Sequence, residues 1–157
     1  MIPANRRRGR RNRQLGEVGE MLTKRALDVA GALCIERVET PWRIRRNAQG
    51  RICGATPVAM VAGDFRAVGP GGRSILAETK LREGKLMWSD IEPHQRWSLT
   101  RHADAGGLSI LAWAWTTEAA ECCLMDWSAL IPIGFGPRVA ITIEQARALH
   151  LGPGSLQ

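Results

Sequence analysis

The stretch GDFRAVGPGGRSILAETK at residues 63–80 has the pattern of a β-hairpin. The segments GDFRAV and RSILAETKL are rich in residues that favour strands, and GPGG between them supplies residues that favour a turn. Three charged residues, Asp64, Glu78 and Lys80, interrupt these apolar segments. A charged side chain in a half-buried strand costs free energy unless it is paired or bound. We therefore expect the three charges to share a function.

The expected register of this hairpin brings the charges together. If the hairpin is centred on Gly71, Asp64 lies directly across from Glu78. This register requires a loop with an odd number of residues, or a bulge. Residues two apart in a strand share a face, so Glu78 and Lys80 point the same way and Thr79 points to the opposite face.

We expect the two carboxylates to hold a divalent metal ion. Carboxylates a few ångströms apart repel each other unless a cation lies between them, and an all-oxygen pair with room for water suits Mg²⁺, with Mn²⁺ as a substitute. Such an ion polarises a phosphoryl oxygen and lowers the pKa of a bound water. Lys80 would orient or deprotonate that water, or neutralise the developing charge. The alternative is that Glu78 and Lys80 belong to a solvated strand face.

The composition indicates one globular domain. The chain has 157 residues, of which 45% are hydrophobic, as expected for a single core. No apolar run is long enough to span a bilayer and no signal peptide is evident at the start, so we expect a cytoplasmic protein without a membrane partner. The four cysteines lack the spacing of a metal site, and we expect them to be reduced and mostly in the core.

The net charge of +7 is concentrated in two arginine-rich segments. We expect residues 1–13 to form a flexible DNA-binding arm, and residues 42–62 to form a basic projecting ribbon or loop on the single domain of residues 14–157. Arginine makes bidentate contacts with phosphate, which favours nucleic acid as the partner over a solubilising tail. The candidate DNA-binding residues are Arg6, Arg7, Arg8, Arg10, Arg11, Arg13, Arg43, Arg45, Arg46 and Arg51.

The remaining elements follow from periodicity. Apolar residues at helical spacing predict a helix that ends at Gly31, with an apolar stripe of Leu15, Val18, Leu22, Ala26 and Val29. A strand then runs to Pro41, and IEPHQRWSLTRHADAGG predicts a second helix. LSILAWAW predicts a central strand buried on both faces, AECCLMDW another strand, and TIEQARAL a last helix with Thr142 as its N-cap. The order αβββαββα predicts an α/β protein with a mixed β-sheet flanked by helices.

The motifs together resemble the PD-(D/E)xK nuclease superfamily, and specifically the RecU-type and archaeal-type Holliday junction resolvases. The matching segments follow the order of that family from about residue 11 to about residue 143: GEVGE, ETP, GDF, ETK, HQ, GGLSILAWAW and IPIGFGPRVAI. Only the hairpin segments GDF and ETK are diagnostic individually. The segment between ETP and GDF corresponds to the projecting stalk of RecU proteins, and here it is short and rich in arginine.

The resemblance implies a restriction-endonuclease-like fold and a metal-dependent, structure-selective endonuclease. Such an enzyme resolves four-way (Holliday) junctions in branched double-stranded DNA by paired symmetric phosphodiester hydrolysis, and acts as a homodimer in recombination and repair. The implied catalytic residues are Glu20, Asp64, Glu78, Lys80 and Gln95, with Asp64, Glu78 and Glu20 as metal ligands and Lys80 as the catalytic lysine.

Several alternatives remain open from the residues alone. Glu17 could replace Glu20, or Glu20 could be an ordinary solvated glutamate, and Gln95 could be a helix surface residue. Trp42, which is adjacent to Arg43, is expected in the core, with base stacking as the alternative. The function could also be that of a same-superfamily nuclease for restriction, repair or transposition, or of an inactive DNA-binding relative.

Overall fold

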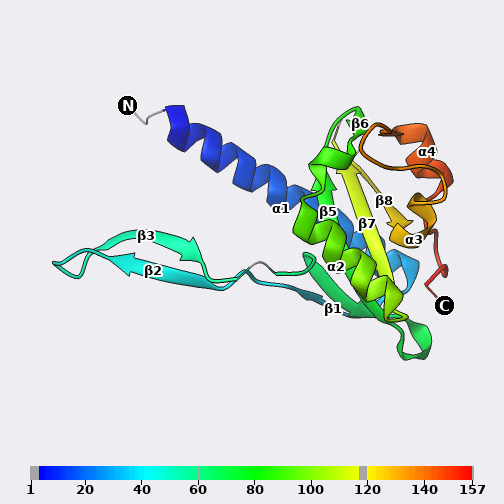
Figure 1. Ribbon diagram of the computed structural model, residues 1–157, viewed down its shortest axis with the longest axis horizontal. Coiled ribbons are helices and arrows are strands. Elements are labelled where there is room, and N and C mark those ends of the chain that lie inside the picture. The colour runs from blue at the N-terminus through cyan, green and yellow to red at the C-terminus, as the bar shows by residue number, and fades with distance from the viewer. Residues whose placement is uncertain (1–3, 60, 117–119, 157) are drawn as a thin grey trace.

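A five-stranded mixed sheet in the order β1-β4-β5-β7-β8 forms the centre of the molecule (Figure 1). The computed structural model describes residues 4–59, 61–116 and 120–156. Strands β5 and β7 are parallel, and the other neighbouring pairs are antiparallel. The expectation of an α/β protein with a mixed sheet is confirmed. The strands are β1 (Leu33–Arg37), β4 (Phe65–Val68), β5 (Ser74–Leu81), β7 (Leu108–Trp115) and β8 (Glu121–Asp126).

The hairpin of β4 and β5 has the predicted register. Val68 pairs with Ser74, so the hairpin is centred on Gly71. A short 3₁₀ helix, η1 (Pro70–Gly72), forms the turn. Gly71 has a positive φ of 81°, which glycine adopts more readily than residues with a Cβ atom. The loop of five residues between the paired ends is the odd-numbered loop that this register requires.

Helices cover both faces of the sheet. Helix α1 (Ala4–Ala30) packs on β5, β7 and β8 from one side. On the other side, α2 (Pro93–Asp104), the one-turn helix α3 (Trp127–Leu130) and α4 (Ile143–Ala148) contribute side chains to a common core cluster. Thr142 caps α4 as predicted, because its hydroxyl accepts from the backbone N–H of Gln145.

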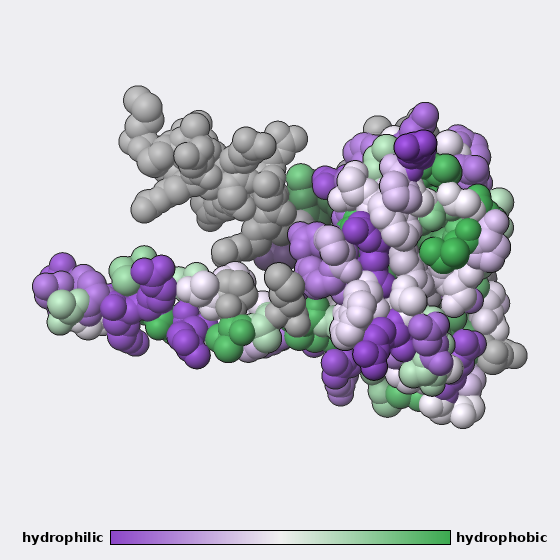
Figure 2. Space-filling model, in the orientation of Figure 1, coloured by the Kyte–Doolittle hydropathy of each residue, from purple (hydrophilic) through white to green (hydrophobic). Residues whose placement is uncertain are grey.

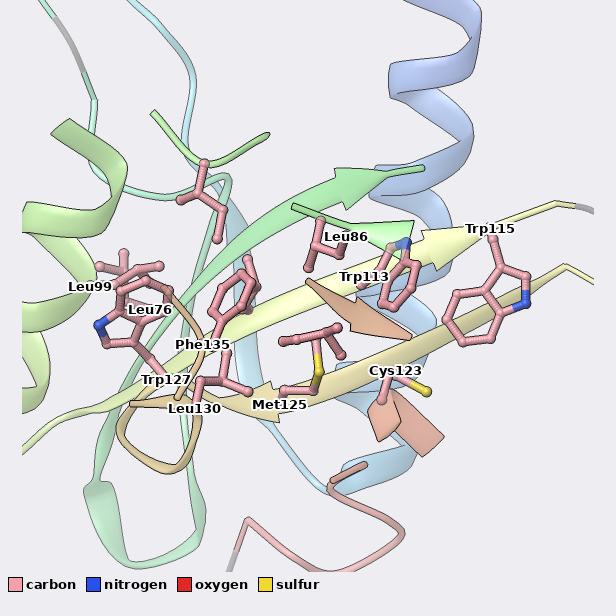
Figure 3. Packing of buried hydrophobic residues seen from close by; sticks show 14 residues of the cluster. Leu76, Leu86, Leu99, Trp113, Trp115, Cys123, Met125, Trp127, Leu130 and Phe135 are labelled. Carbon is pink, nitrogen blue, oxygen red and sulfur yellow. The ribbon is translucent and has the colours of Figure 1, made fainter. Parts of the chain in front are cut away.

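The central strand β7 is buried on both faces, as predicted. Trp113 and Trp115 face the cluster shared with α2, α3 and α4 (Figure 3). Ile110 and Ala112, on the alternate face, pack in the cluster that contains Leu27 of α1. Each large apolar side chain buried in this way stabilises the fold by about 1.5–3 kcal/mol.

Helix α1 differs from the prediction at its start and in its buried face. Its backbone is helical from Ala4, within the segment of residues 1–13 for which we expect a flexible arm. Arginine is a good helix former and no proline follows position 3 before Pro41. Residues 1–3, and the side chains of the six arginines at positions 6–13, lie outside the described part of the chain.

The buried stripe of α1 consists of Gly19, Thr23, Leu27 and Ala30 instead of the predicted apolar stripe, whose last member Val29 is 57% exposed. The reason is a close approach at Gly19, where a Cβ atom would lie 3.3 Å from Cβ of Leu81 in β5. Glycine at this position therefore sets which face of the helix meets the sheet.

The full element order is longer than αβββαββα because the chain contains additional short elements. A hairpin of β2 (Trp42–Arg46) and β3 (Ile52–Pro57) projects from the body as the expected basic ribbon (Figure 1). The short strands β6 (Lys85–Leu86) and β9 (Ile141–Thr142) pair with each other. A second 3₁₀ helix, η2 (Trp88–Asp90), lies before α2.

Two expectations about buried residues are wrong. Trp42 is 59% exposed, because it lies on the projecting hairpin and no second layer covers it. Cys34 and Cys53 are also exposed, whereas Cys123 is buried and Cys122 is half-buried. All four cysteines are free thiols, as predicted.

Among the described residues, no helix has both the length and the apolar character needed to cross a membrane.

Candidate active site

The charged residues of the hairpin meet a glutamine from α2. Glu78 and Lys80 share the face of β5 that is turned toward α2, because they are two residues apart. Lys80 Nζ donates to Glu78 Oε1 at 3.0 Å and to Gln95 Oε1 at 2.7 Å, and Gln95 Nε2 also donates to Glu78 Oε1. The side chain of Glu78 is buried, with only 3% of the residue exposed. The three side chains therefore form one connected polar cluster inside the fold.

Asp64 is held against the same strand. It directly precedes β4, and its Oδ2 accepts from the backbone N–H of Thr79 at 2.8 Å. On the opposite face, the hydroxyl of Thr79 donates to Thr23 of α1 at 3.1 Å. The backbone of β5 thus positions Asp64 and Glu78 together, while α1 anchors the strand from behind.

Gln95 is half-buried and contacts both Glu78 and Lys80, so it does not lie free on the helix surface. It is the third residue of α2, and its Oε1 also accepts from the backbone N–H of Glu92, which caps the helix start. This additional contact fixes the amide, so that its oxygen faces Lys80 and its nitrogen faces Glu78.

Gly63 directly precedes Asp64, and its lack of a side chain allows the backbone to pass close to β5. Its φ is +69°, and a Cβ atom there would lie 2.6 Å from Leu76 Cδ1 and 2.9 Å from the carbonyl oxygen of Ala77. We expect Gly63→Ala to lower the free energy of unfolding by about 3 kcal/mol, from backbone strain and overpacking together. Urea denaturation measures this loss.

The matched control for Gly63→Ala is Gly71→Ala. Gly71 also has a positive φ, of 81°, but nothing lies within 4 Å of a Cβ atom at this position. Its replacement is expected to cost about 1 kcal/mol from the backbone alone. Equal losses for the two variants would contradict the contact argument.

Glu20 lies at the edge of the site and forms an ion pair with Arg37, outside the cluster of Glu78, Lys80 and Gln95. Its Oε2 lies 2.8 Å from Nη2 of Arg37, at the end of β1. Glu20 lines a pocket of about 350 Å³ together with Asp64 and Trp42. Glu17 is exposed and does not line this pocket. Of the two glutamates weighed from the sequence, Glu20 is therefore the one that faces Asp64.

A second pocket, of about 240 Å³, lies on the α2 side of Asp64. Glu78, Gln95, Glu92 and His94 also line it, and Nδ1 of His94 lies 3.3 Å from Oε2 of Glu92. Because Asp64 lines both pockets, its carboxylate lies between the Glu20 side and the Glu78 side of the site.

Burial raises the pKa values of three acidic residues, Glu78, Asp64 and Glu20. Burial, together with the nearby charge of Asp64, raises the pKa of Glu78 to about 7, against the opposing effect of Lys80. Burial also raises the pKa of Asp64, while the hydrogen bond from Thr79 opposes the rise. Burial raises the pKa of Glu20, against the opposing effect of Arg37.

The donor set of Asp64 and Glu78 fits a hard divalent cation. The buried carboxylate of Glu78 and the half-buried carboxylate of Asp64 both have raised pKa values, so they gain from a cation that replaces the protons they would otherwise take up. Oxygen ligands are those that Mg²⁺ prefers. Within residues 4–59, 61–116 and 120–156, no three His, Cys, Asp or Glu side chains converge as a metal-binding group. Glu20 therefore stands apart from the Asp64–Glu78 pair.

The raised pKa of Glu78 predicts a stability that depends on pH. The folded protein binds the carboxyl proton of Glu78 more tightly than the unfolded chain does. The stabilisation of the fold by this proton is therefore complete below the ordinary pKa of 4.5 and is lost as the pH rises through about 7. The free energy of unfolding should fall by on the order of 3 kcal/mol across this range. Glu78→Gln removes this dependence, so it should stabilise the protein most at pH 8.

Chemical denaturation from pH 4.5 to pH 8 without divalent metal checks this prediction. Glu36→Gln on β1, which changes an exposed glutamate, is the matched control for the loss of one acidic group. A constant difference between wild type and Glu78→Gln at all pH values would contradict a buried, protonatable Glu78.

The hairpin of β2 and β3 has two chemically different faces. Arg43 and Arg45 alternate with Trp42 and Ile44 along β2, and all four residues are exposed. Arginines therefore line one face, and apolar side chains line the other. Both hydrophilic and hydrophobic residues are visible on the projection in Figure 2. At the tip, Arg46 Nη1 donates to the carbonyl oxygen of Gly50. Because Trp42 lines the Glu20–Asp64 pocket, the base of the hairpin adjoins the site.

Sequence reasoning missed Arg37 as a site residue. The pattern around Arg37 carries no signal for its pairing with Glu20, because the two residues lie 17 positions apart on different elements. Thr23, which anchors Thr79 from the opposite face, was missed for the same reason.

No protein-family model matches the chain, and no curated protein matches it.

Proposed function

We propose that the protein is a metal-dependent DNA endonuclease of the PD-(D/E)xK type, with a restriction-endonuclease-like fold, that resolves four-way junctions in the cytoplasm. One observation carries this proposal. Lys80 is hydrogen-bonded to Glu78 and Gln95, and these two residues line a pocket together with Asp64. A structural ion pair between Lys80 and Glu78 does not by itself require a second acid across the hairpin. Asp64 is such an acid, and it takes part in none of the ion pairs among the described residues.

Asp64 and Glu78 are the residues that would hold Mg²⁺ or Mn²⁺. When bound, such an ion polarises a phosphoryl oxygen and lowers the pKa of a coordinated water. Glu20 contributes a further carboxylate at the pocket edge, and its ion pair with Arg37 keeps it there.

Lys80 supplies the cationic group for the reaction. Its Nζ is held by Glu78 Oε1 and Gln95 Oε1, which leaves one donor position of the ammonium group for a water or a phosphoryl oxygen. In this position the amine can orient the attacking water or neutralise charge on the phosphorane. Gln95 positions Lys80 and does not itself take part in proton transfer.

Arginines beside the site would bind the phosphates of the DNA. The hairpin of β2 and β3 and the N-terminal part of α1, which carry the candidate DNA-binding arginines, extend from the same side of the body (Figure 1). Contacts to phosphate give shape-dependent binding with little base readout. A homodimer would present two equivalent sites to a two-fold junction, which gives paired nicks.

Substrate choice tests this proposal. Wild type in Mg²⁺ is expected to nick a synthetic four-way junction at opposed strands at least tenfold faster than a linear duplex of the same sequence. Equal rates on the two substrates would favour another nuclease of the same superfamily. Tight junction binding without cleavage, in Mg²⁺ or Mn²⁺, would identify a DNA-binding relative without activity.

A further inference from the structure

A third pocket, with positively charged lining residues, lies beside α2, toward the start of β5. Its volume is about 350 Å³, and Arg66, Ser74, Trp97, Arg101 and His102 are among the residues that line it. Within the described part of the chain, no acidic side chain lines this pocket. Its charge is thus opposite to that of the pocket around Asp64 and Glu78.

The two pockets lie on one continuous surface. Asp64, which directly precedes β4, and Arg66 on β4 are two residues apart and share a face, while Phe65 between them is buried against the other face. Helix α2 packs over β5 and β7, and Arg66 is exposed. The face of the sheet that is turned toward α2 therefore runs from the candidate active site to Arg66 over two residues, roughly 6–7 Å.

One stripe of α2 faces both pockets. Gln95, Ser98 and His102 are spaced by three and four residues, so they lie on the same side of the helix. Gln95 contacts Glu78 at one end, and His102 Nε2 lies 3.0 Å from the hydroxyl of Ser74 at the other. An extended ligand that lies along this side of α2 would contact both pockets.

The cations of the third pocket are available to a ligand. None of the ion pairs among the described residues involves Arg66 or Arg101. The guanidinium of Arg101 lies 5.0 Å from the centre of the Trp97 ring, and Trp97 is 62% exposed. Burial, together with the positive charges of Arg66 and Arg73, lowers the pKa of His102. An exposed aromatic ring beside two available guanidinium groups suits a phosphate with an adjacent base.

We propose that this pocket binds a backbone phosphate of the DNA strand whose neighbouring phosphodiester occupies the candidate active site. Arg66 and Arg101 contact the phosphate, and Trp97 stacks on an adjacent unpaired base. The separation between Asp64 and Arg66, roughly 6–7 Å along the chain, is comparable to the distance between successive phosphates of a DNA strand, which exceeds the helical rise of about 3.4 Å per nucleotide because the backbone winds around the axis. The inference rests on the proposed function for the identity of the strand. The role of the pocket is to position the DNA strand relative to the bond that is cut.

Junction binding by Arg66→Gln/Arg101→Gln, in an Asp64→Asn background that prevents cleavage, tests the proposal. The expected results are roughly tenfold weaker binding and a salt dependence of log affinity that is shallower by about two. Lys85→Gln/Arg138→Gln removes the same charge at exposed positions elsewhere and is expected to change affinity less than threefold. Trp97→Ala should weaken binding roughly tenfold on a junction with unpaired bases.

Single methylphosphonate substitutions, which neutralise one phosphate at a time, locate the contact. One position within about two nucleotides of the cleaved bond should weaken binding of the parent protein but not of the double variant. A double variant that binds as tightly as its control, or that keeps the parent's methylphosphonate profile, would overturn the proposal. If the pocket variants weaken binding but wild type does not cut DNA, the pocket stands and the nuclease function fails. If wild type cuts DNA and the pocket variants bind it normally, the nuclease function stands and the pocket proposal fails.

Discussion

Replacing Lys80 by Ala is expected to slow cleavage of a four-way DNA junction roughly a hundred- to a thousandfold. The reason is that Nζ is the cationic donor of the cluster, held by Glu78 and Gln95. The affinity for the junction should change less than threefold, because Lys80 is largely buried and the DNA-binding arginines are unaffected. Single-turnover cleavage and fluorescence anisotropy, measured on the same junction, separate these two effects.

Two further variants show whether a loss in Lys80→Ala is chemical. Lys80→Gln keeps a donor for Glu78 but lacks the positive charge, so it should fold normally and lose cleavage to the same extent. Lys85→Ala removes an exposed lysine from β6 and should leave the rate unchanged. A Lys80→Gln protein that is folded and cuts within tenfold of wild type would rule out Lys80 as the catalytic cation.

The second large effect is expected on DNA binding. The double variant Arg43→Ala/Arg45→Ala should weaken junction binding roughly ten- to a hundredfold at low salt, and should lower the slope of log affinity against log salt by about two. Both arginines are exposed on the same face of the β2–β3 hairpin, where each can contact one phosphate. Anisotropy titrations over a range of salt concentrations measure the slope.

The control for the hairpin variant is Lys85→Ala/Arg138→Ala, which removes an equal charge from the body of the protein. If both double variants lowered affinity and slope equally, net charge alone would explain the binding. The hairpin would then have no specific role at the junction.

The parts of the fold that could be predicted are those that depend on local sequence. The turn GPGG and the two strands beside it determine a register centred on Gly71, and the structure has this register. The cap at Thr142 and the fully buried strand β7 are likewise readable from a few adjacent residues.

The position of α1 could not be predicted, because a contact between distant residues determines it. Apolar periodicity alone favours the stripe that includes Val29, but the close approach of Gly19 to Leu81 turns Thr23 and Leu27 toward the sheet instead. Trp42 was misplaced for a related reason. Sequence pattern does not distinguish a strand inside the central sheet from one in a separate hairpin without a second layer.

The candidate site was partly accessible from sequence. Asp64, Glu78 and Lys80 follow from the alternation of one hairpin, and their closeness is a consequence of its register. Gln95 came only from the resemblance, and the structure places it in contact with both Glu78 and Lys80. The pairing of Glu20 with Arg37 depends on how α1 crosses the end of β1, which no local pattern encodes.

The most direct test of the central claim is single-turnover cleavage of a four-way junction by wild type and by Asp64→Asn, each with Mg²⁺ and with EDTA. The account predicts paired nicks in opposed strands by wild type in Mg²⁺. It also predicts no cleavage in EDTA, and no cleavage by Asp64→Asn although the variant still binds the junction. Cleavage by Asp64→Asn at the wild-type rate, or tight binding without cleavage by wild type in either Mg²⁺ or Mn²⁺, would contradict the assignment of Asp64, Glu78 and Lys80 as a nuclease centre.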